Sequence, residues 1–125
     1  MTQNKVAHYK KGLWAEQFCK IVLFFCGYRI LAHRYKTPVG EIDIIARKGK
    51  TLIFIEVKAR DSLQQGAEAI QNKAKRRIEN TAKLFLAKNT NIIYDTLRID
   101  VMIVTSFLKP PIWYKNAWLT RSHAE

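Results

Sequence analysis

The chain has 125 residues, enough for one domain with a hydrophobic core of its own. Apolar residues make up 48% of the sequence, which excludes a disordered basic tail. The 22 lysines and arginines outnumber the 10 aspartates and glutamates, so the net charge is +12. This charge favours a nucleic acid or an anionic membrane surface as partner; the alternative is a solvated basic surface or RNA packing of the ribosomal kind.

Residues 1–11 are polar and basic, and we expect a flexible N-terminal arm or the first turn of a helix there. Residues 12–26 carry apolar side chains at helical spacing, and Gly27 provides a natural stop for this helix. Residues 28–35 mix aromatic, aliphatic and basic side chains and indicate a first strand. The Thr-Pro-Val-Gly segment at 37–40 is typical of a turn.

Two apolar segments rich in β-branched residues follow, and both indicate strands. They span 40–45 and 52–58, and a short basic turn at 47–50 separates them. Because both connections are short, we expect the first three strands to form an antiparallel meander.

Residues 60–66 indicate a polar loop, and residues 67–88 indicate a long helix with one apolar and one basic face. Residues 97–104 indicate a fourth strand, and 112–119 a short aromatic strand or an extended tail. The long helix suffices for a right-handed parallel crossover between the third and fourth strands. The order α-β-β-β-α-β predicts an α/β fold, with one mixed sheet flanked by helices, in a single domain over residues 12–125.

The two cysteines, Cys19 and Cys26, lie in the first predicted helix, about 10 Å apart at 1.5 Å per residue. That separation excludes a disulfide within a regular helix, and no Cys-His spacing indicates zinc. Buried free thiols fit a reducing cytoplasm. The apolar run at 21–26 is too short to span a bilayer, so we expect a cytoplasmic protein without membrane association.

Three charged residues interrupt the apolar strands. A charged side chain is unfavourable in such a strand unless it has a functional role. Asp43 lies in the second strand, and Glu56 and Lys58 lie in the third. Residues two apart share a face of a strand, so Glu56 and Lys58 point the same way, as do Glu41 and Asp43. A turn at 47–50 would bring Asp43 near Glu56. The alternatives are exposed residues on a half-solvated strand and turn chemistry at the start of the second strand.

Two carboxylates and an ammonium group at one point suit metal-dependent hydrolysis of phosphodiester bonds. Mg²⁺ usually takes one or two carboxylates, several waters and phosphate oxygens of the substrate, so Asp43 and Glu56 are candidate ligands for Mg²⁺ or Mn²⁺. The metal would polarise the scissile phosphate and lower the pKa of a bound water. Lys58 would orient or activate that water, or stabilise charge that develops on the phosphate.

The pattern Asp-x(12)-Glu-x-Lys resembles the PD-(D/E)xK, or restriction-endonuclease-like, nuclease superfamily, whose core has the same α-β-β-β-α-β order. Within that superfamily the chain is most similar to the YraN family of small bacterial proteins, known largely as proposed endonucleases. Ile42 stands where the superfamily name has proline, a substitution that many members tolerate. The resemblance runs from about residue 10 to the C-terminus and rests on Gly12-x-x-Ala15-Glu16, Gly27-Tyr28, Gly40-Glu41-Ile42-Asp43, Glu56-Val57-Lys58-x-Arg60 and Arg98-Ile99-Asp100-Val101.

The resemblance implies that Asp43 and Glu56 bind the metal and that Lys58 is the catalytic lysine. Glu16 matches a helical glutamate that archaeal Holliday-junction resolvases add to the site, with an ordinary surface glutamate as the alternative. Asp100 has no role in the superfamily, and a charge pair with Arg98 or Lys58 accounts for it. The implied activity is a Mg²⁺-dependent endonuclease acting on DNA, including branched or structured DNA. The competing hypothesis is a non-catalytic nucleic-acid-binding protein that retains the nuclease fold.

Basic residues of the second helix and of the loop before it are candidate contacts to the substrate. They are Arg60, Lys73, Arg76 and Arg77. Such residues bind phosphates without reading the base sequence, and no base-reading motif is present. We therefore expect DNA as the partner, and a homodimer is compatible with the sequence.

Overall fold

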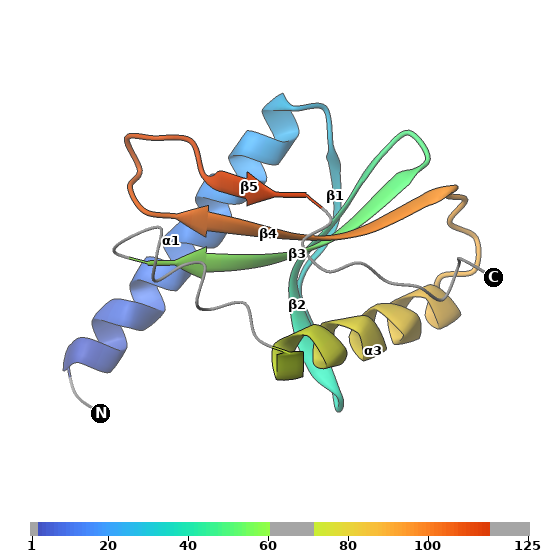
Figure 1. The fold of residues 1–125 in the computed structure, drawn as a ribbon, viewed down its shortest axis with the longest axis horizontal. Coiled ribbons are helices and arrows are strands. Elements are labelled where there is room, and N and C mark those ends of the chain that lie inside the picture. The colour runs from blue at the N-terminus through green and yellow to red at the C-terminus, as the bar shows by residue number, and fades with distance from the viewer. Residues whose placement is uncertain (1–2, 61–71, 116–125) are drawn as a thin grey trace.

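The computed structural model describes residues 3–60 and 72–115, which form one five-stranded sheet and two helices (Figure 1). The strands lie side by side in chain order, from β1 at one edge to β5 at the other. The elements are α1 (Gln3–Phe25), β1 (Arg29–Thr37), β2 (Gly40–Lys48), β3 (Thr51–Ala59), α3 (Asn72–Lys88), β4 (Thr96–Val104) and β5 (Ile112–Tyr114).

The sheet is mixed, as the element order predicts. Strands β1, β2 and β3 are antiparallel neighbours joined by short turns. Strand β4 pairs with β3 in parallel, and the chain between them contains α3. Strand β5 pairs antiparallel with the end of β4. Short turns allow the antiparallel pairs among β1, β2 and β3, and the parallel pair needs the longer helical connection.

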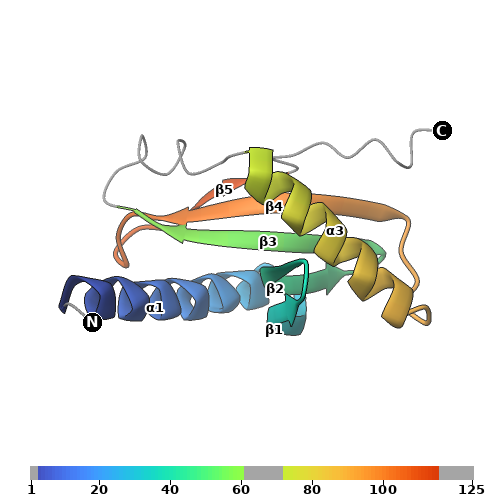
Figure 2. The same cartoon turned by 90° about the horizontal axis from the view of Figure 1, so that it is seen from below.

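The two helices cover opposite faces of the sheet (Figure 2). The alternation along β3 shows this directly: Leu52 and Phe54 pack with α3, and Ile53 and Ile55 pack with α1. Each of these four side chains is fully buried. Burying one such side chain contributes about 1.5–3 kcal/mol, so the middle of the sheet is the most strongly held part of the fold.

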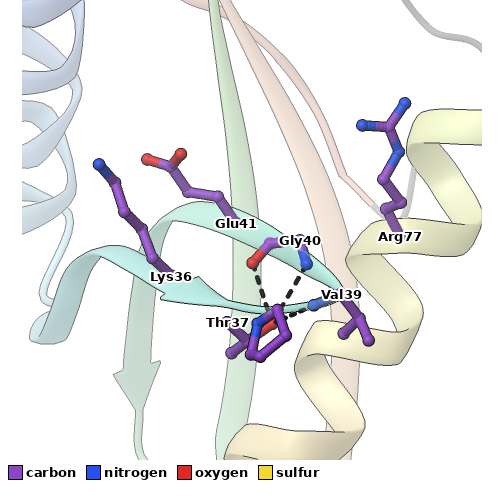
Figure 3. Close-up of a pocket in the computed structure, with 7 residues that line it drawn as sticks. Lys36, Thr37, Val39, Gly40, Glu41 and Arg77 are labelled. Carbon is purple, nitrogen blue, oxygen red and sulfur yellow. Dashed lines mark hydrogen bonds between the residues drawn. The ribbon is translucent and has the colours of Figure 1, made fainter.

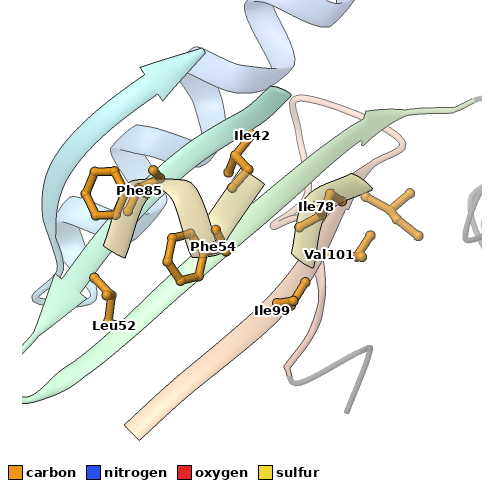
Figure 4. Packing of buried hydrophobic residues seen from close by; sticks show 10 residues of the cluster. Ile42, Leu52, Phe54, Ile78, Phe85, Ile99 and Val101 are labelled. Atoms are coloured by element: carbon orange, nitrogen blue, oxygen red, sulfur yellow. The ribbon is translucent and has the colours of Figure 1, made fainter. Parts of the chain in front are cut away.

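Two apolar clusters result. The α3 cluster, drawn in Figure 4, comprises Ile42, Ile45, Leu52, Phe54, Ile78, Ala82, Phe85, Ile99, Val101 and Ile103. The α1 cluster comprises Ala15, Cys19, Leu23, Tyr28, Ile44, Ala46, Ile53, Ile55, Met102 and Val104. In the α3 cluster the ring of Phe85 meets the rings of Tyr35 and Phe54 edge to face, with centroids 5.3 and 5.9 Å away.

The first helix is longer than the sequence indicated. It begins at Gln3, so most of the segment expected as an N-terminal arm is helical. The lysines, alanine and glutamine of this segment are good helix formers, and a helix that is already packed on the sheet can extend through them. Gly12 does not interrupt it, since a glycine inside a helix costs only about 1 kcal/mol relative to alanine.

The end of α1 agrees with the prediction that Gly27 stops the helix. Gly27 has a φ of +90°, in the left-handed region that glycine adopts without strain. Its N–H donates to the carbonyl of Phe24 at 3.0 Å, and the N–H of Tyr28 donates to the carbonyl of Leu23 at 2.9 Å. These two bonds form a Schellman cap. The cap turns the chain so that Tyr28 enters the α1 cluster.

Four other expectations are confirmed, two of them only over part of their predicted range. Strand β4 and the turn at 37–40 lie where the sequence placed them. The second long helix is confirmed over Asn72–Lys88, while 61–71, which includes most of the predicted loop, lies outside the described residues. The last strand is confirmed only for Ile112–Tyr114, and residues 116–119 also lie outside them.

Both cysteines are free thiols, as predicted. Cys19 is buried, but Cys26 is exposed, so the expectation that both are buried is wrong for the second. Cys26 follows the last turn of α1, beyond the part of the helix that packs on the sheet. Neither α1 nor the described part of α3 is long and apolar enough to cross a membrane.

Candidate active site

The site begins where β2 leaves β3. The pairing of these strands runs from Lys48 opposite Thr51 to Ile44 opposite Ile55 and ends there. One further step in this register would place Asp43 opposite Glu56. Instead, a side-chain oxygen of Asp43, Oδ2, accepts a hydrogen bond of 2.8 Å from the backbone N–H of Val57. A carboxylate thus satisfies a backbone donor that β2 no longer pairs, as a buried donor requires.

Glu56 and Lys58 lie at the same end of β3 and form an ion pair. The Lys58 Nζ atom is 2.8 Å from Glu56 Oε2, and their side chains are 24% and 15% exposed. Because they are two residues apart in a strand, both point to one face. The low exposure strengthens the pair relative to a surface salt bridge.

Glu16, on α1, faces the same region. Its Oε1 atom is 3.9 Å from Arg34 Nη1, and its side chain is 15% exposed. Burial raises the pKa of Glu16, Arg34 lowers it, and the negative charges of Glu41 and Glu56 raise it further. Glu16 therefore lies close enough to the carboxylates of the strands to interact with them electrostatically. A glutamate on the outer face of α1 would be too far away. We call Glu16, Asp43 and Glu56 the carboxylate cluster.

Asp43 carries the strongest electrostatic signal of the cluster. Burial, with the negative charge of Glu56 next in importance, raises the pKa of Asp43 to about 8, although the Val57 N–H opposes the shift. Glu16 adds to the effect. The neighbouring thiol responds to the same environment, since burial and the charges of Asp43 and Glu16 raise the pKa of Cys19 to about 12. The surroundings of Asp43 thus oppose a negative charge on it, and its carboxyl group keeps a proton at neutral pH.

Arg34 is a member of the site that the sequence analysis missed. Its guanidinium lies 3.9 Å from Glu16 and 3.9 Å from Glu41. It has a φ of +52° and is the single non-glycine residue with positive φ within 3–60 and 72–115. A residue held in this region costs about 1–3 kcal/mol, and such strain often occurs at functional sites.

The signal that could have found Arg34 is its place in the first hairpin. His33 pairs with Ile44 and Tyr35 pairs with Ile42, so Arg34 stands across from Asp43. Counting back through the turn at 37–40 gives the same partner. The positive φ has no such signal in the sequence.

A divalent cation fits the donors that the cluster offers. Asp43 and Glu56 supply hard oxygen atoms, and a cation would relieve the repulsion that raises the pKa of Asp43. No group of three or more His, Cys, Asp or Glu side chains within the described ranges is placed to hold a metal. Mg²⁺ needs one or two carboxylates and completes its shell with water and phosphate, so two ligands suffice for it.

The predicted substrate contacts are dispersed. Arg76 and Arg77 are exposed on α3, and Lys73 lies in the same helix with its side chain outside the described part of the structure. Arg60 follows β3 directly and is half-buried, and its Nη1 atom donates to the carbonyl of Ala59 at 2.8 Å.

Asp100 is a structural residue rather than a member of the site. It is completely buried, and the guanidinium of Arg98 donates to both of its oxygens at 3.2 and 2.8 Å. The indole N–H of Trp113 donates to it at 2.9 Å. Of the two partners considered from the sequence, Arg98 is the one observed, and Trp113 joins β5 to this core pair.

Comparisons with known proteins agree on one family. The sequence model of a protein family described as "Uncharacterised protein family UPF0102" matches residues 15–104. This range contains the whole carboxylate cluster and Lys58. A UPF0102 protein of Chelativorans sp. (strain BNC1) is 41% identical over 113 residues, which is 90% of either chain. One from Nitrobacter winogradskyi is 43% identical over 100 residues, covering 80% of this chain and 85% of the relative. One from Brucella canis is 37% identical over 125 residues, covering 98% and 96%. The chain therefore belongs to the UPF0102 family, the YraN family that its motifs resemble.

Proposed function

We propose that the protein is a metal-dependent endonuclease that hydrolyses phosphodiester bonds in DNA, with branched or structured DNA among its substrates. The observation that carries this proposal is the position of Asp43, Glu56 and Lys58 together where β2 separates from β3. A net charge of +12 supports a polyanionic substrate. Acidic side chains facing such a substrate have no use in a pure binder unless a cation lies between them.

Each residue has a defined task in this mechanism. Asp43 and Glu56 would hold the cation, and the hydrogen bond from the Val57 N–H to Oδ2 fixes the Asp43 side chain beside Glu56. A bound Mg²⁺ would supply positive charge against the scissile phosphate and acidify water. Lys58 would donate from its ammonium group to the attacking water or to a phosphate oxygen. Glu56 holds that ammonium in place at 2.8 Å.

The test separates catalysis from affinity. Lys58→Ala removes one of 22 basic residues, so DNA affinity should change less than about twofold. The cleavage rate should fall roughly a hundredfold or more, because the ammonium acts mainly in the transition state. Lys50→Ala, in the exposed β2–β3 turn, is the matched control and should leave both unchanged. Linear, flapped and four-way-junction DNA should be assayed with Mg²⁺ and with Mn²⁺.

Two results would contradict the proposal. If Lys58→Ala cleaved DNA at the wild-type rate, Lys58 would have no role in the mechanism. Absence of metal-dependent cleavage of every DNA and RNA form by the wild-type protein would instead favour the non-catalytic nucleic-acid-binding protein.

Binding has its own test. The logarithm of DNA affinity should fall linearly with the logarithm of salt concentration, because lysines and arginines displace condensed counterions. Fluorescence anisotropy across a salt series measures this slope. A flat response would exclude phosphate contacts as the basis of binding.

Metal binding is tested by isothermal titration with Mn²⁺ or Mg²⁺ in the presence of DNA. Asp43→Asn should weaken the metal site, since it replaces a charged ligand with a neutral one. Unchanged binding in Asp43→Asn would show that the metal lies elsewhere.

A further inference from the structure

A groove of about 420 Å³ lies between the β1–β2 hairpin and α3 (Figure 3). The hairpin contributes Lys36, Thr37, Val39 and Glu41, and the helix contributes Arg77. Figure 3 shows the basic side chains of Lys36 and Arg77 rising from opposite walls. Lys36 was not among the substrate contacts indicated by the sequence.

The β1–β2 hairpin approaches α3 closely at Gly40, beside the groove. A Cβ atom at Gly40 would lie 2.7 Å from Thr81 Oγ1 and 3.2 Å from the carbonyl oxygen of Arg77, so only glycine allows this approach. The Thr81 hydroxyl donates to that same carbonyl at 2.8 Å. The Thr37 hydroxyl accepts from the N–H of Gly40 at 3.2 Å and donates to its carbonyl at 3.0 Å. The Thr81 bond lies within α3 and the Thr37 bonds lie within the β1–β2 turn, so each hydroxyl fixes one wall of the groove.

The groove presents cations to solvent. Lys36 and Arg77 are both exposed, and neither has a carboxylate partner among the residues of the described structure. Glu41 is the acidic side chain of the lining, and Arg34 lies 3.9 Å from its carboxylate. Lys36 and Arg77 come from two different elements, the hairpin and α3. Their spacing is therefore better fixed than that of two charges on one flexible segment.

The groove also adjoins the carboxylate cluster. Glu41 lines the groove and contacts Arg34, and Arg34 in turn contacts Glu16 of the cluster. An anion bound by Lys36 and Arg77 would therefore lie next to the proposed catalytic centre, but not in it. Val39 and Pro38 are the apolar lining, and the lining contains no aromatic ring on which a base could stack.

We propose that this groove binds a backbone phosphate of the nucleic-acid strand whose scissile bond reaches the carboxylate cluster. The inference rests on the proposed function and adds the path of the strand: it runs along the β1–β2 hairpin, between Lys36 and Arg77. Contact is to phosphate and not to bases, so the groove positions the strand without reading its sequence.

The experiment compares two double variants that each remove one lysine and one arginine. Lys36→Ala/Arg77→Ala removes the two cationic side chains that line the groove. Arg29→Ala/Lys50→Ala removes exposed charges at the opposite end of the β1–β2–β3 meander and is the matched control. Affinity for a fluorescein-labelled DNA duplex is measured by anisotropy in EDTA, so that no cleavage occurs. The groove variant should bind DNA roughly tenfold more weakly, and the slope of log affinity against log salt concentration should decrease in magnitude by about 1. The control variant should lose less than about threefold in affinity.

A crosslink tests the position directly and does not depend on affinity. Val39→Cys, 42% exposed at the hairpin tip, carries a photoactivatable azidophenacyl group in a Cys26→Ser background. It should crosslink to the duplex, and the same group at Lys50→Cys should not. Thermal melting confirms that each variant is folded.

The outcomes are distinct. Equal losses of DNA affinity in the two double variants, or equal crosslinking at positions 39 and 50, would show that the groove is not the phosphate site. Either result would leave the proposed function intact. Failure of the wild-type protein to bind DNA would instead overturn the proposed function. A third arm adds inorganic phosphate or thymidine monophosphate: if either binds through Lys36 and Arg77 while the groove variant keeps full DNA affinity, the groove takes a small phosphate compound and the strand path is wrong.

Discussion

Replacing Asp43 with asparagine should stabilise the metal-free protein. The pKa of Asp43 rises from 3.8 to about 8 on folding, chiefly because the carboxyl group is buried, and next because Glu56 repels its charge. Between pH 4 and pH 8 the folded state therefore binds a proton that the unfolded state lacks. Stability is full below pH 4, falls as the pH rises towards 8, and is level above it. Asparagine cannot ionise, so this loss disappears.

The size of the effect follows from the same shift. About three pH units separate 3.8 from pH 7, and each is worth about 1.4 kcal/mol, so ionisation linked to Asp43 costs the fold about 4 kcal/mol at pH 7. Asparagine can still accept from the Val57 N–H, but a neutral acceptor forfeits about 1 kcal/mol. The net expectation is a gain of about 3 kcal/mol at pH 7, or about 10 °C in Tm for a chain of this length.

Urea denaturation in EDTA at pH 4, 7 and 8.5 measures the gain. Asp95→Asn makes the same substitution at an exposed position before β4 and should change stability by less than about 0.5 kcal/mol at every pH. At pH 4 the ionisation contributes nothing, so Asp43→Asn should be about 1 kcal/mol less stable than wild type; the difference should change sign as the pH rises and become a gain that grows towards pH 8. A destabilised Asp43→Asn at pH 7, or a difference independent of pH, would refute the reasoning. Millimolar Mn²⁺ should stabilise wild type and leave Asp43→Asn unaffected.

Three further predictions concern the fold. Gly40→Ala should lose about 2 kcal/mol in urea denaturation because its methyl group collides with α3, whereas Gly12→Ala, with open space around it, should gain about 0.5–1 kcal/mol. A thiol-reactive dye should label Cys26 at once and Cys19 only after unfolding, because Cys19 is buried and its pKa is raised to about 12; a Cys26→Ser variant that still reacts quickly would contradict this. Asp100→Ala should lower stability by about 3 kcal/mol in the same denaturation assay, since it leaves the half-buried guanidinium of Arg98 and the indole N–H of Trp113 without the buried carboxylate to which both donate; a loss below about 1 kcal/mol would show that the pair is dispensable.

The sequence predicts the sheet well because its signals are local. Short turns separate the first three strands, and hydrophobic alternation assigns their faces. The apolar run Leu52–Ile55 also implies burial on both faces, and α1 and α3 provide the two covers. Gly27 ends α1 for a purely local reason, a positive φ.

The site is predictable only in part. Asp43 and Glu56 are matched by the hairpin register, so their proximity follows from counting residues. That β2 turns away from β3 after Ile44 does not follow from counting, since the residues there favour strand. At that point the side chain of Asp43, and not the backbone of β2, accepts from the Val57 N–H, a replacement that no local sequence pattern predicts.

The start of α1 shows the same limit from the other side. The residues before Gly12 have good helix propensity, but propensity alone does not hold a short helix in water. They extend a helix that the sheet already anchors through Ala15, Cys19 and Leu23. A flexible arm and a continued helix therefore have the same local sequence, and packing decides between them.

The charges of the site explain why its strain and repulsion persist. Without a ligand, Lys58 pairs with Glu56, and Arg34 lies between Glu16 and Glu41. Both cations are thus held by carboxylates, while Asp43 remains uncompensated. Selection for stability alone disfavours a buried ionisable side chain such as Asp43 and a positive φ at a non-glycine residue such as Arg34, because each costs free energy of folding. In the proposed mechanism a cation would neutralise the carboxylates, and a phosphate would take up the freed ammonium and guanidinium groups. The proposed function thus gives a reason for a charge arrangement that stability alone does not favour.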